Sequence, residues 1–281
     1  MKPHPLLQEV IAIIVRTVPT EKIALLAFTS QEQATWNFFH PQPPEILAPT
    51  KLNLLILARS TRESRHELLD MIEQRCKHKI PIAALLLTPE EFKILLSKGN
   101  PFAMAVLQAN HWIFEDRNIV STISSNNLII PEPANQHREI ACWYKNALSF
   151  LRIAKSQQQY GELGMTAFCL HQAAEQFLSM LSQAVTGFRY SSHNLDKTLS
   201  FLRFYLPDMN QVFIRTTAAE RARFQLLKTT YTRFRYKSDF DITATDINYL
   251  MNEVLKLQTI AEKIFRSKIA PFHLQQHRSH A

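Results

Sequence analysis

The strongest constraint on the fold is a helical segment in the second half of the chain, because it sets two titratable side chains in an Ala-rich, otherwise apolar surface. Residues 167–178 read Ala-Phe-Cys-Leu-His-Gln-Ala-Ala-Glu-Gln-Phe-Leu. Apolar residues recur there at helical spacing, at Ala167, Leu170, Ala174, Phe177 and Leu181. His171 and Glu175 lie one turn apart beside this stripe. The small side chains at 173 and 174 let a neighbouring helix approach closely, so the segment is predicted to pack against other helices.

A glutamate beside the core of a bundle needs a positively charged partner. An unpaired buried carboxylate is very costly, so Glu175 is expected to contact a cation, and Arg235 is the candidate. Two interpretations of His171 and Glu175 stay open. They form a satisfied polar network that orients helices, or they are the remnant of a ligand-binding or catalytic cleft.

The composition predicts two domains of different character. The chain has 281 residues, 46% of them hydrophobic, which is enough to fill two cores. Only 4 glycines stand beside 14 prolines, which argues against Gly-rich phosphate loops and repeat folds. The net charge of +8 lies wholly in the second half, since residues 1–137 hold 13 basic and 13 acidic side chains and residues 138–281 hold 19 and 11.

Several features indicate a cytoplasmic protein that does not enter a membrane. The apolar run Leu6–Val15 is interrupted by Gln8 and Glu9 and reads as an amphipathic helix without the cleavage site of a leader. No stretch reaches the roughly 18 apolar residues that a membrane span needs. Three widely spaced cysteines favour neither a disulfide framework nor a zinc site.

The order of elements predicts an α+β protein of two domains joined by a linker. Residues 1–118 alternate between strand and helix patterns, which indicates an α/β domain with a mixed sheet. Its strands are expected at 23–28, 52–58, 80–87 and 112–114, and its helices at 6–17, 61–78 and 90–98. Residues 119–137 are polar, hold two prolines and are expected to be the linker.

The second half of the chain is predicted to be entirely helical. Residues 138–270 are expected to form a bundle of four or five helices, at 139–159, 165–185, 196–205, 209–234 and 245–266. Residues 271–281, which carry three histidines, are expected to be a disordered tail.

The first domain resembles the minimal nucleotidyltransferase family in its order of helix, strand, polar turn, strand, helix and strand. Members carry Gly-Ser after the first strand and two aspartates, spaced by one residue, on the second, because two magnesium ions need clustered carboxylates. This chain has Thr29-Ser30 at the turn and Lys51 and Asn53 at the acidic positions. The strand 82–87 offers no carboxylate either, so we expect no nucleotidyl transfer.

Two interpretations of these four residues stay open. Thr29 and Ser30 are simple turn formers, while Lys51 and Asn53 are solvated residues at a strand start. Alternatively, the domain is a pseudo-enzyme that keeps a phosphate-sized pocket at Ser30 and Lys51 and binds a nucleotide without turnover.

The second domain resembles the HEPN family, small helical bundles that occur beside or fused to minimal nucleotidyltransferases. The resemblance rests on residues 167–178, on His193-Asn194-Leu195 and on the run from Tyr231 to Tyr236. It implies a homodimer formed through the long helices and a toxin–antitoxin-like ancestry. The candidate polar cleft consists of His171, Glu175, His193, Tyr231, Arg235 and Tyr236. Asn194 is expected to cap the helix that follows it.

Ribonucleases of the HEPN family carry an arginine followed, after four to six residues, by a histidine. The matching site here, residues 235–242, reads Arg-Tyr-Lys-Ser-Asp-Phe-Asp-Ile and holds no histidine. In-line attack by a 2′-hydroxyl needs a base and a cation, so metal-independent RNA cleavage is not expected.

A basic stretch between residues 215 and 237 is the candidate nucleic-acid patch. Its cations are Arg215, Arg221, Arg223, Lys228, Arg233 and Lys237, with Arg235 among them. The interleaved aromatics, which include Phe213, Phe224 and Tyr231, could stack on bases while the cations meet phosphates. The other interpretation is that the aromatics are core residues and the cations form a solvated face.

Together these features favour a non-catalytic regulatory or interaction protein that senses a nucleotide or RNA. One alternative is an enzyme, either a HEPN-type ribonuclease using His171, His193 and Arg235 or a nucleotidyltransferase with an atypical active site. Another is a basic nucleic-acid-binding protein. No metal site and no cofactor are predicted, although a magnesium nucleotide is compatible with the sensor hypothesis.

Overall fold

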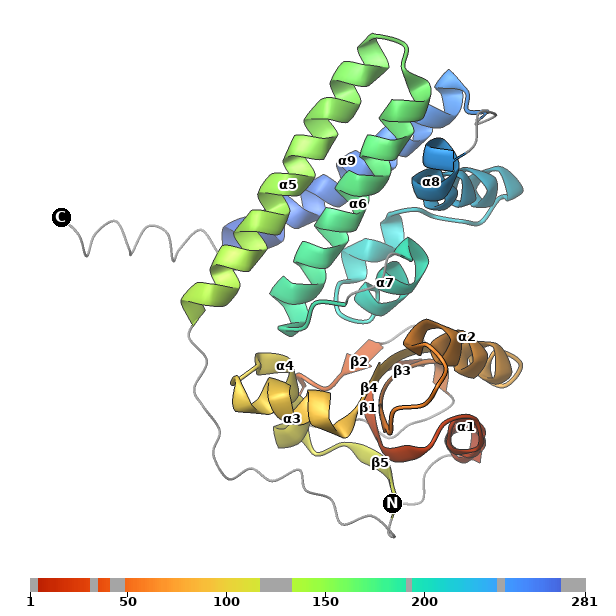
Figure 1. The fold of residues 1–281 in the computed structure, drawn as a ribbon, viewed down its shortest axis with the longest axis vertical. Coiled ribbons are helices and arrows are strands. Elements are labelled where there is room, and N and C mark those ends of the chain that lie inside the picture. Colours follow the sequence, from red (N-terminus) through yellow and green to blue (C-terminus); the bar gives the residue numbers. More distant parts are fainter. Residues whose placement is uncertain are drawn as a thin grey trace, which may run out of the picture. The chain divides into compact units, whose positions relative to one another are not determined.

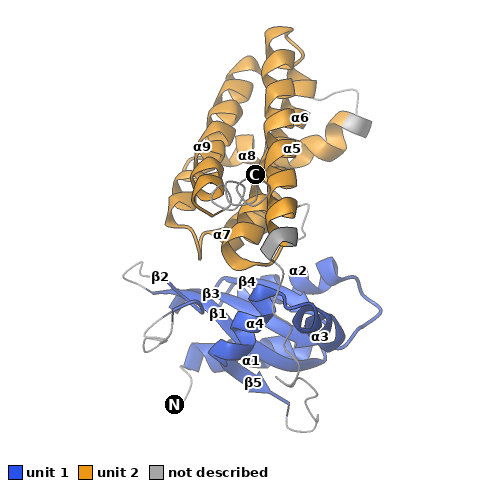
Figure 2. Ribbon diagram, turned by 90° about the vertical axis from the view of Figure 1, so that its left-hand side faces the viewer, with its two compact units in different colours: residues 1–131 blue, residues 132–281 orange. Residues whose placement is uncertain are grey.

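The computed structural model describes two compact units. The described residues are 5–30, 35–40, 49–116, 133–190, 194–236 and 241–268. The units span residues 1–131 and 132–281 (Figure 2). The first is a mixed sheet with helices and the second is helical, which confirms the two-domain α+β class. Among the described residues, no helix has both the length and the apolar character required to cross a bilayer.

The first unit alternates helices and strands much as predicted. Its elements are α1 (Pro5–Thr17), β1 (Thr20–Ser30), β2 (Thr35–Asn37), β3 (Pro49–Ala58), α2 (Arg65–Cys76), β4 (Ile82–Leu87), α3 (Pro89–Ser97), α4 (Pro101–Ala109) and β5 (Trp112–Glu115). The sequence did not predict β2 and α4. β2 has only three residues, whereas α4 carries a local signal, since Asn100 caps it and Pro101 occupies its first position.

The strands form one sheet with both antiparallel and parallel neighbours. The order is β2-β1-β3-β4, and β5 pairs with β1. β1 runs antiparallel to β2, β3 and β5, whereas β3 and β4 run parallel. Residues 23–28, 52–58 and 82–87 are buried without alternation, so both faces of the sheet need cover. Figure 1 shows α1 and α2 on one side of the sheet and α3 and α4 on the other.

Capping boxes fix where two helices of this unit begin. At α2, the Ser64 hydroxyl accepts a hydrogen bond from the backbone N–H of Glu67, and the Glu67 carboxylate accepts one from the backbone N–H of Ser64. Thr88 and Glu91 form the same pair of hydrogen bonds at α3. The helix expected at 61–78 therefore begins only at Arg65. Both helices start close to the end of the strand before them, β3 for α2 and β4 for α3.

The second unit is built around a central helix, α6 (Leu163–Thr186). The other elements are α5 (Pro133–Gln159), α7 (Leu195–Leu202), the 3-10 helix η1 (Pro207–Gln211), α8 (Ala218–Tyr236) and α9 (Ala244–Lys268). α6 packs against α5, α7, α8 and α9 (Figure 1). Its apolar stripe, Ala167, Leu170, Ala174, Phe177 and Leu181, is fully buried.

Two predicted boundaries in this half were wrong. The linker expected at 119–137 overlaps α5, which already begins at Pro133. The helix expected at 209–234 is two elements, η1 and α8, separated by irregular backbone. Phe213 adopts a left-handed φ of 50°, is completely buried and donates its backbone N–H to the Glu253 carboxylate on α9. In a continuous helix this N–H would donate to the carbonyl four residues earlier, so the bond to Glu253 is incompatible with an unbroken helix through Phe213.

Candidate functional site

The candidate phosphate-binding residues of the first unit lie at one end of β1 and β3. Thr29 faces Lys51 in the antiparallel register, so the two side chains share a face of the sheet. Ser30 pairs with Pro49 beyond a register shift. The hydroxyl of Thr50 donates to the carbonyl oxygens of Thr29 at 3.0 Å and of Ser30 at 3.3 Å, which ties the two strand ends together.

Asn53 lies inside the sheet and not at its solvent-exposed end. It is completely buried, and its amide Nδ2 donates to the carbonyl oxygen of Ala83 on β4 at 2.8 Å. The interpretation of Asn53 as a solvated residue is therefore wrong. An amide can donate to a carbonyl whereas a carboxylate cannot, so this position suits asparagine rather than the aspartate of a nucleotidyltransferase.

His171 and Glu175 occupy the interior of the second unit. His171 is 2% exposed, and its Nδ1 lies 2.9 Å from the carbonyl oxygen of Leu227 on α8. A carbonyl only accepts, so Nδ1 carries a proton and donates it. The other ring nitrogen, Nε2, lies 3.7 Å from the Glu175 carboxylate. Tyr231 stacks on the imidazole with its ring centre 5.8 Å away.

This arrangement brings three of the six candidate cleft residues together, namely His171, Glu175 and Tyr231. His193 lies outside the described residues, and nothing is described of the side chains of Arg235 and Tyr236. The expected pairing of Glu175 with Arg235 therefore stays a prediction. The described contacts are those of a polar network between α6 and α8.

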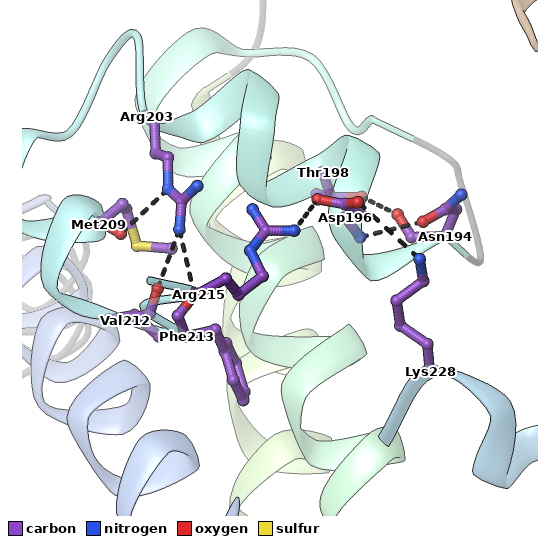
Figure 3. A network of polar contacts seen from close by, with 9 residues as sticks. All are labelled: Asn194, Asp196, Thr198, Arg203, Met209, Val212, Phe213, Arg215 and Lys228. Atoms are coloured by element: carbon purple, nitrogen blue, oxygen red, sulfur yellow. Dashed lines mark hydrogen bonds and ion pairs between the residues drawn. The ribbon is translucent and has the colours of Figure 1, made fainter. Parts of the chain in front are cut away.

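A second polar network joins the start of α7 to α8 and to the irregular segment before it (Figure 3). Asn194 accepts a hydrogen bond from the backbone N–H of Asp196 at 3.0 Å, which confirms that it caps α7. Asp196 forms an ion pair with Arg215, and its carboxylate lies 3.8 Å from the ammonium group of Lys228. Two cations of the basic stretch thus share the partly exposed carboxylate of Asp196.

Arg203 extends this network toward the backbone. Its guanidinium donates to the carbonyl oxygens of Met209 at 3.4 Å, Val212 at 3.1 Å and Phe213 at 3.5 Å (Figure 3). Burial lowers the pKa of Arg203, and nearby Arg215 lowers it further while Asp196 opposes the shift. The side chain therefore holds the irregular segment between α7 and α8 in place.

The remaining described cations of the basic stretch also have internal partners, with one exception. Arg223 pairs with Asp246 at 3.0 Å and lies over the ring of Tyr249. Arg221 donates to the carbonyl oxygens of Arg215 and Thr216. Arg233 is exposed on α8, and Lys237 lies outside the described residues.

Two aromatics of the stretch, Phe213 and Phe224, belong to the core. Phe213 is completely buried and Phe224 is 3% exposed. Arg215 and Lys228 lie over the Phe224 ring, with 4.8 and 5.8 Å to its centre. The interpretation in which these two rings stack on bases is therefore wrong, and the core interpretation is confirmed for them.

Two acidic residues with structural roles were missed by the sequence analysis, Asp196 and Glu253. Glu253 is 4% exposed, accepts from the Phe213 backbone and pairs with Lys256 at 2.6 Å. Asp196 carried a weak local signal, as an acid in the first turn of a capped helix. Their partners are 19 and 40 residues away in sequence, so spacing could not reveal them.

Metal and thiol chemistry have little support in the described part of the chain. No cluster of three or more histidine, cysteine or carboxylate side chains is positioned there to hold a metal ion. Burial raises the pKa of the Cys76 thiol to about 11, with a further contribution from Glu73, and burial also raises the pKa of Cys169. Both thiols are therefore protonated, and so poorly nucleophilic, at neutral pH.

The comparisons with known proteins support one half of the resemblance. No curated protein matches the chain. The family match lies within the second unit, so the nucleotidyltransferase resemblance of residues 1–118 stays a prediction. Residues 140–264, which run from within α5 to within α9, match the family model of the HEPN domain and so confirm the HEPN resemblance of the helical unit.

Proposed function

We propose that this protein is a non-catalytic regulatory or interaction protein of nucleotidyltransferase and HEPN ancestry, which responds to a nucleotide or RNA without turning it over. The observation that carries the proposal is the buried amide of Asn53. It stands where the resemblance places a metal-binding acid, and it donates to the Ala83 carbonyl instead. A buried, hydrogen-bonded amide offers magnesium neither charge nor an open coordination position.

The helical unit supports the same conclusion. His171 uses Nδ1 on the Leu227 carbonyl and lies almost wholly inside the protein. A general base must reach the proton of its substrate, so a 2%-exposed imidazole whose Nδ1 is already hydrogen-bonded is a poor candidate. The cations Arg215 and Lys228 are directed at Asp196.

Turnover assays on the full chain test the non-catalytic part. Single-stranded RNA and nucleoside triphosphates are incubated with the protein, with and without magnesium. We expect no product beyond that formed by the Arg235→Ala and Asn53→Ala variants. Product that forms with the wild type and disappears in either variant would overturn the proposal and establish an enzyme.

Thermal unfolding with a panel of nucleotides and short RNAs tests the sensing part. A ligand that binds only the native state raises the melting temperature by mass action. We expect a rise for at least one ligand. Its loss in Lys51→Ala would place the site in the first unit, and its loss in Arg235→Ala would place it in the second. A flat panel would contradict nucleotide and RNA sensing.

Self-association through the helical unit is part of the proposal. Support comes from the HEPN match and from three large apolar side chains that are exposed on α5, on α6 and at the turn between them: Ile153, Tyr160 and Met165. Tyr160, at 77% exposure, leaves most of its ring available for such a contact.

A further inference from the structure

A row of positively charged side chains follows one face of α5. Arg138, Lys145 and Arg152 recur at intervals of seven residues, and Lys155 continues the row. Seven residues are close to two helical turns, so the four side chains lie within about 100° of the helix circumference. All four are exposed. From residue 138 to residue 155 the row extends along the helix by about 26 Å.

The position of α5 in the bundle leaves this face open to solvent. α5 packs chiefly against α6, and Figure 1 shows it at the outside of the helical unit. Its contacts with α9 include the stacking of Tyr144 on Phe265 and the hydrogen bond from Gln158 to Asn248. The completely or almost completely buried residues of α5 belong to a different face; they are Ile140, Ala147, Leu151 and Ala154.

No nearby acid neutralises the row. Between residues 138 and 159 the only acid of α5 is Glu139, which lies about 100° around the helix from Arg138. The three acids of the neighbouring helix α9 pair with cations of α8 and α9: Asp246 with Arg223, Glu253 with Lys256 and Glu262 with Arg266. Among the described residues, none forms an ion pair or a side-chain hydrogen bond with a cation of the row.

The spacing of the row suits an extended polyanion better than a single small anion. Arg138, Lys145 and Arg152 are about 10 Å apart along the helix, which is too far for two of them to bind one phosphate. Separate cations at such intervals can each meet a different phosphate of a chain that runs along the helix. Each contact releases counterions from the nucleic acid, so the contacts add to the affinity without any base being read.

We infer that this row on α5 binds the phosphate backbone of a nucleic-acid strand, which under the proposed function is RNA. The inference rests on the proposed function only for the choice of RNA as the polyanion. The row differs from the basic stretch at 215–237, where Arg215, Arg223 and Lys228 are engaged in ion pairs. It also differs from the exposed apolar surface of α5 and α6, since Ile153 lies about 100° around the helix from Arg152.

The salt dependence of RNA binding by the full chain tests the row. Fluorescence anisotropy of a labelled oligouridine of about 15 nucleotides gives the association constant at several salt concentrations. Its logarithm should fall with the logarithm of the salt concentration with a slope of about −0.7 for each phosphate contact. Four contacts therefore predict a slope of about −3 for the wild type.

Two double variants that remove the same charge separate the row from a general effect of net charge. Lys145→Gln, Arg152→Gln should halve the slope and weaken binding about 25-fold at about 0.1 M salt, because each lost contact costs about fivefold there. Arg233→Gln, Lys263→Gln is the matched control, at exposed cations of α8 and α9, and should keep the wild-type slope. Gln159→Lys, at an exposed position one turn beyond Lys155, should make the slope steeper by about 0.7.

Equal slopes in the two double variants would overturn the inference, and so would a wild type that does not bind RNA at low salt. Single-stranded DNA of the same length should bind with the same slope, because its phosphates are the same. Polyglutamate bound as tightly as RNA would instead indicate an acidic protein partner and contradict the choice of a nucleic acid. The melting temperature of each variant checks that it folds. A response to nucleotides without binding at the row would leave the proposed function standing, whereas turnover of RNA would contradict that function and leave the row standing.

Discussion

Asn53 is a completely buried amide in the middle of the sheet, at a position where the resemblance to nucleotidyltransferases predicts an acid. Replacing it with aspartate, Asn53→Asp, introduces a carboxylate and removes the donor to the Ala83 carbonyl. At pH 7 we expect a loss of about 3 kcal/mol in the free energy of unfolding, because a charge is buried opposite a carbonyl oxygen. Urea denaturation followed by tryptophan fluorescence measures it.

The pH dependence gives this variant a distinct signature. Burial raises the pKa of the introduced carboxyl above its unfolded value of about 3.9, so the penalty is small below that pH and grows as the pH rises toward the folded pKa. Lys51→Asp, at the partly exposed position two residues earlier, should cost less than about 1 kcal/mol at any pH. A penalty for Asn53→Asp that is equally large at pH 3 and pH 7 would contradict the buried hydrogen bond.

At the residue scale, local capping could be predicted and long-range pairing could not. Asn194 is followed by a helical pattern, and it caps α7 as expected. Asp196, two residues later, pairs with Arg215 because α7 and the segment before α8 pack together. That contact depends on tertiary structure, so the basic stretch looked far more available to an external anion than its ion pairs allow.

At the scale of elements, Arg203 is expected to hold the segment that connects α7 to α8. Arg203→Met removes the donor to three backbone carbonyls and should lower the free energy of unfolding by about 2–3 kcal/mol. Arg203→Lys should recover little, since a point charge cannot reproduce the planar fork. Arg233→Met, at an exposed arginine of α8, is the control and should change stability by less than about 0.5 kcal/mol. Equal effects of the two methionine variants, measured by chemical denaturation, would refute this role.

The capping box of α3 should make stability depend on acid pH. Burial acts to raise the pKa of Glu91, but hydrogen bonds from Thr88 and Arg65 outweigh it, so the folded pKa lies below 4.5. A lowered carboxyl pKa stabilises the fold above the unfolded value, and this contribution is lost as the pH falls through the folded pKa. Glu91→Gln should therefore cost about 0.5–1 kcal/mol at pH 7, and this cost should shrink as the pH falls below 4.5 and the carboxyl of the wild type becomes protonated. Glu90→Gln, at the exposed neighbouring position, should show no such dependence on pH.

Buried strands follow from the sequence more directly than the ends of helices do. The buried runs 23–28 and 52–58 lie within β1 and β3, because strands covered on both faces need continuous apolar sequence. The helical pattern from Met209 was misleading, since Pro207–Gln211 closes as a 3-10 turn and Phe213 is drawn to Glu253. Periodicity reports which residues are apolar, but it does not report where a backbone N–H finds a partner on another helix.

For the molecule as a whole, the unequal distribution of charge agrees with its division into two units. The balanced first half matches unit 1–131 and the basic second half matches unit 132–281 closely. Several cations of the second unit form ion pairs with Asp196, Asp246 and Glu253. The net charge of this unit is unchanged by these pairs, but Arg215, Arg223 and Lys228 are engaged within the fold, which weakens the argument for a nucleic-acid patch built from them.

Self-association of the whole chain is expected to depend on the α5–α6 surface. Sedimentation velocity of the wild type should show a dimer, and the double variant Ile153→Glu, Met165→Glu should shift it to monomer, because like charges would be placed in an apolar contact. Ile94→Glu is the matched control, since Ile94 is 51% exposed on α3 in the first unit and should leave the dimer intact. A monomeric wild type would contradict self-association. A dimer that survives the double variant but dissociates in Ile94→Glu would instead place the contact on the sheet domain, and the HEPN unit would then have a role other than holding two copies together.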